Sequence, residues 1–507
     1  MISTDTALQP RTAIRWIDTA ALLAIAAAFA LLHILTNSRY GFHRDELQFL
    51  SDARHLDWGF VAYPPFTPFV ERISLSLFGI SLVGLRLFSV LAQAVVILVS
   101  GLMARDLGGT RLAQVATALS VGLSAVPLFE ATEFQYTSFS YFWWILVCFF
   151  TIRLLKSQDP RWFVAIGACI GLALLSKYSV VFFVAGLLAG LAFTPARRFF
   201  TSGWFWFGAA LAFLLVLPNL IWLARHNFVS YHFLQHIHAR DVREGRADAY
   251  WKYQFLFDIN PIALPLALVG LIACLRSSRY RVLAWMYAVP VLFFWIGKGR
   301  FYYVAEAYPA VVAMGAAAAA HWLITRPAWL RRSLASAFFI GLFAFGSLGA
   351  SVFIPFASSG PLRNFALAHN GDLREEIGWN QLVRTVAQIR NALPARQQDN
   401  LGVFASNYGE YGAIEILGRP YGLPEPIGTT NSEWLRGYPS PAPAALIVLG
   451  LTAKQANTLF TGCRLAGHNG NSQGVRNEES QHHPDIFLCG PPHQPWPQFW
   501  KENQWFG

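Results

Sequence analysis

Long runs of apolar residues, separated by short polar loops, dominate the first 354 residues. Each run approaches the roughly 20 residues that a helix needs to cross a bilayer. The runs lie near residues 17–35, 83–103, 112–129, 139–155, 162–176, 179–194, 203–223, 259–275, 282–297, 304–324 and 334–354. Only Ser176-Lys177-Tyr178 separates the fifth run from the sixth, so this is the weakest boundary between two predicted helices. The pattern predicts a polytopic α-helical membrane protein with about eleven transmembrane helices.

The composition excludes several other classes of protein. Only 13% of the 507 residues are charged and 55% are hydrophobic, whereas a soluble domain has roughly a quarter charged residues. A soluble enzyme, a disordered chain and a disulfide scaffold are therefore excluded. The net charge of +11 would suit a nucleic-acid partner, but the basic excess lies in residues 1–354. Basic cytoplasmic loops explain this distribution, so we expect a lipid bilayer and no nucleic acid as partner.

Basic residues in alternate loops predict the orientation. The loops that carry them hold Arg105 and Arg111; Arg153, Lys156 and Arg161; Arg197 and Arg198; Arg276, Arg279 and Arg281; Arg326, Arg331 and Arg332. Together with Arg11 and Arg15, they predict a cytoplasmic N-terminus. The first run lacks a clear cleavage site and is interpreted as a retained helix. An odd number of spans then places residues 355–507 outside the inner membrane, in the periplasm of a Gram-negative cell.

Residues 355–507 have the composition of a soluble domain. Leu401–Ser406 and Ala444–Leu449 are typical of buried strands, and Trp379–Leu393 and Thr452–Phe460 of helices. We therefore predict a transmembrane domain over residues 1–354, with a long first outer loop (37–80), and a small periplasmic α/β domain over 355–507.

Two of the five cysteines, Cys463 and Cys489, fall in the exported part of the chain. A disulfide can form there, and from the sequence a bridge and two free thiols remain equal alternatives. Cys148, Cys169 and Cys274 lie in predicted spans and are interpreted as packed thiols.

Candidate chemistry gathers on the predicted outer side, first of all in the first loop. Residues 40–50 contain the pair Asp45-Glu46, and an aromatic segment with a Tyr63-Pro64-Pro65 turn follows. Aromatic residues among charges predict short helices that lie in the membrane interface. Adjacent carboxylates near a bilayer are costly to ionise, so one of them is expected to have a partner or a raised pKa. The alternative is an acidic first helical turn, which the spacing alone favours.

Other outer segments supply cations and histidines. Lys298 and Arg300, flanked by glycines and tyrosines, suit a phosphate at the membrane boundary, although interfacial snorkelling is the commoner role. Lys177 is either another phosphate contact or a turn residue. His232 and His236 stand four apart, but nothing completes a metal site, and an amphipathic loop helix is the favoured interpretation.

Three motifs resemble one family. The Asp45-Glu46 loop, the Tyr63-Pro64-Pro65 turn and the segment Lys298–Tyr303 resemble bacterial GT-C glycosyltransferases of the protein O-mannosyltransferase and aminoarabinose transferase superfamily. The resemblance covers about residues 15–325. Residues 238–243 and the tail motif 406–410 also look like those of family members.

The resemblance implies a sugar transferase that uses a polyprenyl-phosphate sugar donor on the outer membrane face, with inversion and without a nucleotide-sugar site. The acceptor is a lipid, a glycan or a protein, and no metal or other cofactor is expected. Asp45 matches the aspartate that acts in catalysis, and Glu46 is expected to orient Asp45 or the acceptor.

Candidate donor-binding residues follow partly from the resemblance and partly from chemistry. Some relatives have a charged residue at the position of Tyr63, where it touches the donor phosphate. Lys298 or Arg300 is expected to substitute for it, and Arg240, Lys177 and Tyr302 are further donor-binding candidates.

Two other functions compete with this one. A glycan ligase or polymerase would use a polyprenyl-diphosphate donor instead. A membrane transporter is less favoured, because the ionisable residues gather at one face and no inverted repeat is visible.

Overall fold

The computed structural model describes residues 16–507, so Arg11 and Arg15 lie outside the described part of the chain. It divides into two compact units, and each is described by itself. Unit 1 contains residues 16–37, 86–224 and 238–354, and unit 2 contains residues 38–85, 225–237 and 355–507. The first loop and the segment 225–237 thus group with the C-terminal residues. The division into domains 1–354 and 355–507 stays a prediction.

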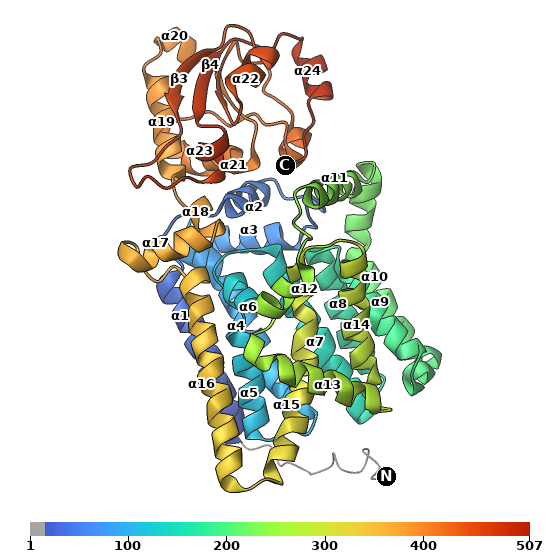
Figure 1. The fold of residues 1–507 in the computed structure, drawn as a ribbon. Coiled ribbons are helices and arrows are strands. Elements are labelled where there is room, and N and C mark those ends of the chain that lie inside the picture. Colours follow the sequence, from blue (N-terminus) through green and yellow to red (C-terminus); the bar gives the residue numbers. More distant parts are fainter. Residues whose placement is uncertain (1–15) are drawn as a thin grey trace. The chain divides into compact units, whose positions relative to one another are not determined.

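Unit 1 is helical, as the apolar runs predict, and every predicted run coincides with one or more helices (Figure 1). Its elements are α1 (Trp16–Thr36), α4 (Leu82–Asp106), α5 (Arg111–Gly122), α6 (Ala125–Glu130), α7 (Tyr136–Ser157), α8 (Trp162–Ser176), α9 (Val180–Ala192), η1 (Pro195–Thr201), α10 (Gly203–Arg225), α12 (Tyr250–Tyr253), η2 (Gln254–Asp258), η3 (Pro261–Ala263), α13 (Leu264–Arg276), α14 (Arg281–Ile296), η4 (Phe301–Ala307), α15 (Tyr308–Ile324) and α16 (Ala328–Phe353). Helix α11 (Val229–Arg243) crosses the boundary between the units.

The lengths of these helices give a lower number of spans than the sequence predicts. Within residues 16–507, six helices are long and apolar enough to cross a membrane, or up to eight if each of two bent pairs forms one span. Helices α8 and α14 are apolar but shorter. The polytopic helical fold is confirmed, and the number of eleven crossings stays a prediction.

The run predicted as one span over residues 112–129 is broken, because α5 ends at Gly122 and α6 begins at Ala125. The break is held by Asn260, whose backbone N–H donates to Ser124 Oγ at 2.7 Å and whose side chain donates to the carbonyl of Leu123 at 3.0 Å. These bonds satisfy backbone and hydroxyl groups that a membrane would leave unpaired. A polar contact from a distant segment therefore interrupts an otherwise apolar run.

Close packing of α13 on α15 fixes the segment that precedes α15. A Cβ atom on Gly270 would lie 1.8 Å from the carbonyl oxygen of Val311, and one on Gly315 would lie 1.8 Å from that of Leu266. Small residues allow helix backbones in membranes to approach this closely. The pair anchors α15, and with it the 3-10 helix η4, which precedes α15 directly and carries Tyr302.

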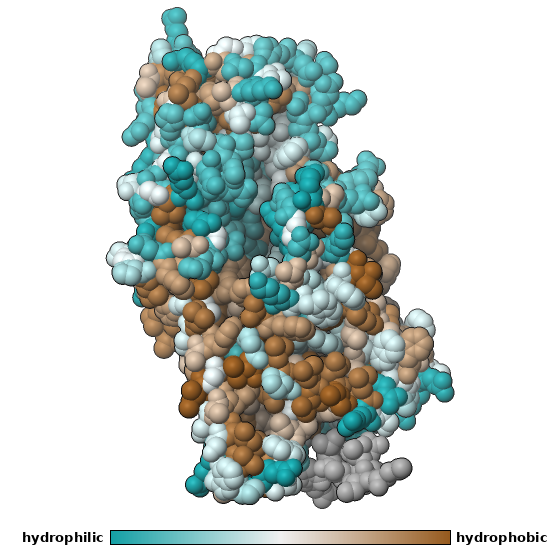
Figure 2. Space-filling view, in the orientation of Figure 1, coloured by the Kyte–Doolittle hydropathy of each residue, from teal (hydrophilic) through white to brown (hydrophobic). Residues whose placement is uncertain are grey.

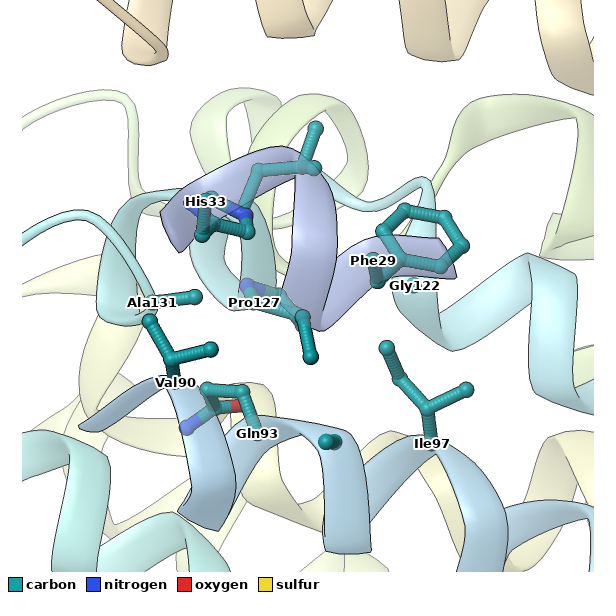
Figure 3. A pocket seen from close by; sticks show the side chains of 11 residues that line it. Phe29, His33, Val90, Gln93, Ile97, Gly122, Pro127 and Ala131 are labelled. Carbon is teal, nitrogen blue, oxygen red and sulfur yellow. The ribbon is translucent and has the colours of Figure 1, made fainter. Parts of the chain in front are cut away.

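A small cavity lies among α1, α4 and α6 (Figure 3). Its volume is about 10 Å³, and Phe29, Val90 and Ile97 are among the apolar residues that line it. His33 and Gln93 are polar side chains in its wall. A cavity of this size holds about one water molecule, so it is too small for a sugar.

Unit 2 contains the two helices of the first loop and a small α/β fold. Its elements are α2 (Arg44–Arg54), α3 (Phe66–Phe78), α17 (Gly360–His369), α18 (Asp372–Glu375), α19 (Trp379–Asn391), α20 (Ala395–Gln398), β1 (Leu401–Ala405), α21 (Tyr408–Leu417), η5 (Arg419–Tyr421), η6 (Asn431–Arg436), β2 (Ala445–Leu449), α22 (Ala453–Leu459), β3 (Arg464–His468), α23 (Glu478–His482), β4 (Asp485–Cys489) and α24 (Trp496–Glu502). The sheet order is β1-β2-β4-β3, with β1 parallel to β2 and β4 antiparallel to both of its neighbours.

The core of the α/β fold is aromatic, with Phe404, Phe460 and Phe499 at 2% exposure or less. The structure joins Cys463 and Cys489 in a disulfide, which decides the alternative that the sequence left open. Cys148, Cys169 and Cys274 are buried free thiols, as predicted.

The two units differ in surface character. Figure 2 shows broad hydrophobic areas over the helices of unit 1, whereas the surface of the C-terminal α/β fold is mostly hydrophilic. In unit 2, α3 has an apolar face, on which Ile73, Leu77 and Phe78 are exposed. Such a face suits the membrane interface, where the sequence predicts the first-loop helices.

Candidate active site

The pair Asp45-Glu46 lies in the first turn of α2, and a capping box starts this helix. His43 Nδ1 accepts a hydrogen bond from the backbone N–H of Asp45 at 3.2 Å, and Glu46 Oε2 accepts from the backbone N–H of His43 at 2.8 Å. Such reciprocal bonds satisfy donors that a helix start leaves free. Glu46 is fully buried and is therefore occupied in holding the helix start.

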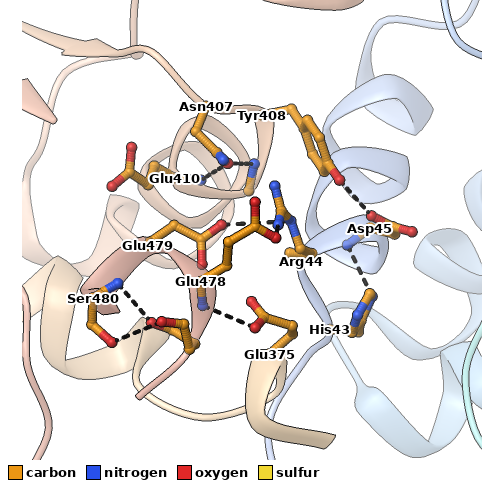
Figure 4. A network of polar contacts seen from close by, with 12 residues as sticks. His43, Arg44, Asp45, Glu375, Asn407, Tyr408, Glu410, Glu478, Glu479 and Ser480 are labelled. Atoms are coloured by element: carbon orange, nitrogen blue, oxygen red, sulfur yellow. Dashed lines mark hydrogen bonds and ion pairs between the residues drawn. The ribbon is translucent and has the colours of Figure 1, made fainter. Parts of the chain in front are cut away.

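Asp45 differs from its neighbour because it is only partly buried and faces the C-terminal residues of unit 2 (Figure 4). The hydroxyl of Tyr408, the first residue of α21, donates to Asp45 Oδ1 at 3.0 Å. Asn407 caps that helix by accepting from the backbone N–H of Gly409 at 2.7 Å. The tail motif 406–410 thus positions a hydrogen-bond donor on the predicted catalytic carboxylate.

Arg44, which precedes Asp45, is surrounded by glutamates from the tail (Figure 4). Its guanidinium pairs with Glu478, lies 3.5 Å from Glu479 Oε1 and stacks 4.7 Å from the centre of the Tyr408 ring. Charge-assisted pairs of this kind are stronger than neutral hydrogen bonds. Arg44 thereby ties the start of α2 to the tail beside Asp45.

The glutamates around Arg44 outnumber it, and this changes their protonation. Burial, reinforced by the neighbouring Glu479 charge, raises the pKa of Glu375 to about 8. Burial also raises the pKa of Glu410, and again the charge of Glu479 adds to the shift. Because desolvated like charges disfavour ionisation, this cluster holds protons at neutral pH.

A second network in unit 2 involves Tyr63, which the sequence assigned to the donor phosphate. Tyr63 is 3% exposed and donates its hydroxyl to the buried carboxylate of Asp52. Arg436 Nη2 donates to the other oxygen of Asp52 at 2.5 Å. Burial raises the pKa of Asp52 to about 6, although Arg436 opposes the shift. The hydroxyl of Tyr63 is thus occupied within the protein.

In unit 1, the structure brings Arg300 and Tyr302 together with Asp241. Arg300 Nε and Nη2 donate to the two carboxylate oxygens of Asp241 at 2.6 and 2.7 Å. Its third nitrogen, Nη1, donates to the hydroxyl of Tyr302 at 3.0 Å. Arg240 is next to this pair in sequence, and its Nε lies 3.9 Å from Asp241. The bidentate pair fixes the Arg300 guanidinium in one orientation.

Lys177 lies between α8 and α9 and faces aromatic rings. Its Nζ is 4.4 Å from the centre of the Tyr303 ring and 5.9 Å from the rings of Tyr136 and Tyr302. Cation–π contacts hold an ammonium group without neutralising it. Tyr302 therefore contacts both Lys177 and Arg300, and these three predicted residues form one cluster in unit 1.

Lys298 is exposed and has a positive φ of 51° between two glycines. It is two residues from Arg300, so it remains at the edge of the cluster. His236 lies 5.8 Å from the ring of Trp505 and 6.0 Å from that of Phe506. Among residues 16–507, no group of three or more histidine, cysteine or acidic side chains is arranged to hold a metal ion.

The sequence missed the residues that surround Asp45. Tyr408, Glu375, Glu478 and Glu479 lie more than 300 residues from Asp45 in the chain. The tail motif 406–410 was a signal for Tyr408 alone. The predicted carboxylates and Tyr63 lie in unit 2, whereas the predicted lysines and arginines lie in unit 1.

Comparisons with known proteins find a family model, a relative and solved structures that this chain resembles. Residues 62–222 match the family model described as dolichyl-phosphate-mannose-protein mannosyltransferase. This range includes Tyr63 and Lys177 but begins after Asp45. The chain is also 26% identical over 285 residues to the lipid A galacturonosyltransferase RgtD of Rhizobium johnstonii. The match covers 53% of this chain and 58% of the relative, so the likeness spans little more than half of that protein.

Solved structures show the same fold. The structure of ArnT from Cupriavidus metallidurans bound to undecaprenyl phosphate aligns over 93% of this chain and 98% of its own, with a TM-score of 0.55 and 14% identity. The oligosaccharyltransferase AglB from Archaeoglobus fulgidus, in complex with an inhibitory peptide and a dolichol-phosphate, aligns over 88% of this chain and 70% of its own. Its TM-score is 0.51 at 11% identity.

Proposed function

We propose that the chain is a GT-C glycosyltransferase that transfers a sugar from a polyprenyl-phosphate carrier to an acceptor. Its likeness to the mannosyltransferase family model, to the lipid A galacturonosyltransferase and to the fold of ArnT supports the proposal. The acceptor is a lipid, a glycan or a protein on the outer face of the inner membrane. The observation that carries the proposal is Asp45, a partly accessible carboxylate held by the Tyr408 hydroxyl at 3.0 Å.

In the proposed reaction, Asp45 accepts the proton of the acceptor hydroxyl or amine as that group attacks the sugar. Its neighbour Glu46 keeps the helix start in place through the capping box. A positioned base of this kind accelerates a reaction by roughly 10²–10⁴. The Tyr408 hydroxyl, which donates to Oδ1, orients the Asp45 carboxylate.

The lipid phosphate leaves as a stable anion, so the reaction needs cations rather than a general acid. Lys177 and Arg300 supply them in the proposal, with Tyr302 between the two. The solved relatives bound to undecaprenyl phosphate and dolichol-phosphate support a polyprenyl-phosphate donor. The name of the Rhizobium relative supports a lipid acceptor.

The test is a transfer assay with purified protein in liposomes. Polyprenyl-monophosphate sugars and polyprenyl-diphosphate sugars are supplied in parallel, and mass spectrometry follows loss of the sugar from each donor. We expect turnover with monophosphate donors alone. Turnover with diphosphate donors alone would instead establish a ligase or polymerase. Glycolipids and glycoproteins of a deletion strain identify the acceptor by the mass that they lose.

The proposed location depends on topology and has its own test. Reporters fused after Arg198 and Arg332 are expected to be cytoplasmic, because basic loops stay inside. A reporter fused at Gly360 is expected to be exported. A cytoplasmic reporter at Gly360 would separate the tail from the outer face and contradict the proposed location.

A further inference from the structure

A hollow in unit 2, outside the residues considered for transfer, is lined by three arginines. Its volume is about 540 Å³. Arg363 comes from α17, Arg374 from α18, and Arg476 from the loop before α23. The other polar lining residues are neutral, and no carboxylate occurs among the described residues that line the hollow. Three separate segments therefore converge on one positively charged space.

The arginines are not neutralised by the contacts that hold two of them. Arg363 Nη2 donates to the amide oxygen of Gln473 at 2.5 Å, and Arg374 Nη1 donates to the carbonyl of Leu367 at 2.8 Å. Arg363 Nε is buried without a hydrogen-bond partner among residues 16–507. Arg476 is exposed. Guanidinium groups stay charged in proteins, so the hollow retains a positive charge that an anion would neutralise.

This charge is a product of folding rather than of composition. The tail as a whole is nearly balanced, with 11 basic and 12 acidic residues from position 355 onward. Residues that are adjacent in the sequence belong to different sites: Arg374 lines the hollow, whereas Glu375 belongs to the cluster around Arg44. Arg476 and Glu478 diverge in the same way. Sorting of charge to two sites increases the potential inside the hollow.

The first arginine of the hollow follows a candidate membrane span closely in the chain. Helix α16, long and apolar enough to span a bilayer, ends at Phe353, and α17 begins at Gly360. Arg363 comes ten positions after Phe353, which limits their distance to about 35 Å. On α17, Leu362 is 43% and Phe365 37% exposed. Exposed apolar residues beside an arginine are typical of a helix at a lipid interface.

We propose that the arginine hollow binds the phosphorylated headgroup of a membrane lipid. Arginine forks match the oxygens of a phosphate group and can bind them in pairs. The volume exceeds that of one phosphate and leaves room for the rest of a headgroup. The exposed Leu362 and Phe365 favour a lipid over a soluble phosphate. The binding is separate from sugar transfer and does not depend on the proposed reaction.

The test measures lipid binding to the purified full chain in detergent by native mass spectrometry, with no sugar donor present. The probes are phosphatidic acid, diacylglycerol, phosphorylated lipid A, dephosphorylated lipid A and inorganic phosphate alone. The test variant replaces Arg363, Arg374 and Arg476 with alanine. A control with the same net charge replaces three exposed arginines outside the hollow, which are Arg384, Arg396 and Arg464.

The test variant is expected to bind both phosphorylated lipids roughly ten- to a hundredfold more weakly, as loss of charge-assisted contacts predicts. The control is expected to bind like the unchanged protein. Lipids without phosphate are expected to bind weakly to every variant. Tighter binding of lipid A than of phosphatidic acid would identify a glycolipid ligand, and equal binding would identify a general phospholipid site; both support the proposal.

Three results would overturn the proposal. In the first, the test variant keeps full affinity for the phosphorylated lipids. In the second, both triple variants lose affinity equally. In the third, inorganic phosphate binds as tightly as phosphatidic acid. If the test variant does not fold, Arg476→Ala alone decides, because this side chain is exposed and its loss leaves the contacts of Arg363 and Arg374 intact. A several-fold loss of affinity is then expected. Activity plays no part in this readout, so failure of the proposed transfer reaction leaves the result unaffected.

Discussion

Two arginines, one in each unit, show opposite balances of charge. Arg300 in unit 1 pairs with Asp241, a carboxylate that Arg240 and Arg246 also approach. Arg44 in unit 2 is surrounded by several glutamates, two of which have raised pKa values. The surroundings of Asp241 in unit 1 therefore hold more cations than this carboxylate neutralises, whereas the surroundings of Arg44 in unit 2 hold a surplus of carboxylates that keep protons. This difference matches the proposed roles, in which cations of unit 1 stabilise the donor phosphate and a carboxylate of unit 2 accepts the acceptor proton.

The largest expected effect tests the carboxylate side of the comparison. Asp45→Asn keeps the size of the side chain and its bond to Tyr408 but cannot accept a proton at neutral pH. Transfer is expected to fall by roughly 10²–10⁴, the range for loss of a general base. Turnover of purified protein measures the change, with donor binding as the control. Because His43 and Glu46 form the capping box, the variant is expected to keep the helix start, and near-normal turnover would contradict the role of Asp45 as the base.

The next effect tests the cationic side. Lys177→Met removes the ammonium group but keeps a long apolar side chain among the rings of Tyr136, Tyr302 and Tyr303. The apparent donor affinity is expected to fall roughly ten- to a hundredfold. Lys298→Met is the matched control, because Lys298 is exposed, and we expect a small change. If the two variants behave alike, the donor phosphate does not bind at the aromatic cluster.

A smaller effect tests whether the tail contributes to the site through Tyr408. Tyr408→Phe removes the hydroxyl that donates to Asp45 but keeps the ring that stacks on Arg44. Loss of one hydrogen bond to a charged group costs about 1.5–3 kcal/mol. At a partly exposed carboxylate such as Asp45, the cost is expected at the lower end of this range. We expect kcat to fall several-fold up to about tenfold, with KM for the donor unchanged. Equal loss of thermal stability and activity would indicate a structural role alone.

The smallest effect concerns pH and the surplus of carboxylates. The pKa of Glu375 is raised to about 8 in the folded protein, so the folded state holds a proton that the unfolded state releases from about pH 4.5 upward. Its contribution therefore favours folding at low pH and is lost as pH rises toward 8.

Glu375→Gln keeps the acceptor for the backbone N–H of Glu478 and is expected to lessen the fall in melting temperature between pH 6 and 9 by roughly 2–8 °C. Differential scanning fluorimetry measures this slope. Asp399→Asn, at an exposed position, provides the control. An unchanged slope in the Glu375 variant would show that this carboxyl does not hold the proton.

Several features of the protein were determined by short stretches of sequence. The apolar runs predict the helices of unit 1 because burial in a bilayer depends on length and hydropathy, which are local properties. The strands at Leu401–Ala405 and Ala445–Leu449 and the helix at Trp379–Asn391 also follow from local patterns. Strands β3 and β4 were missed. Strand β3 is mostly exposed and carries little apolar signal, whereas β4 is buried but only five residues long.

Other features were decided by tertiary contacts between distant residues. Contacts from Asn260 hold the break in the run over 112–129, and no property of that run predicts the break. Asp45 and Glu46 are chemically alike and adjacent, yet one forms the capping box and the other faces Tyr408, 363 residues away. Charge shows the same limit: the sequence gives a nearly neutral tail, and folding sorts it into an arginine hollow and an acidic cluster. The sequence determines which residues are buried on average, but electrostatic surroundings depend on distances of a few ångströms, and only the folded chain sets those distances.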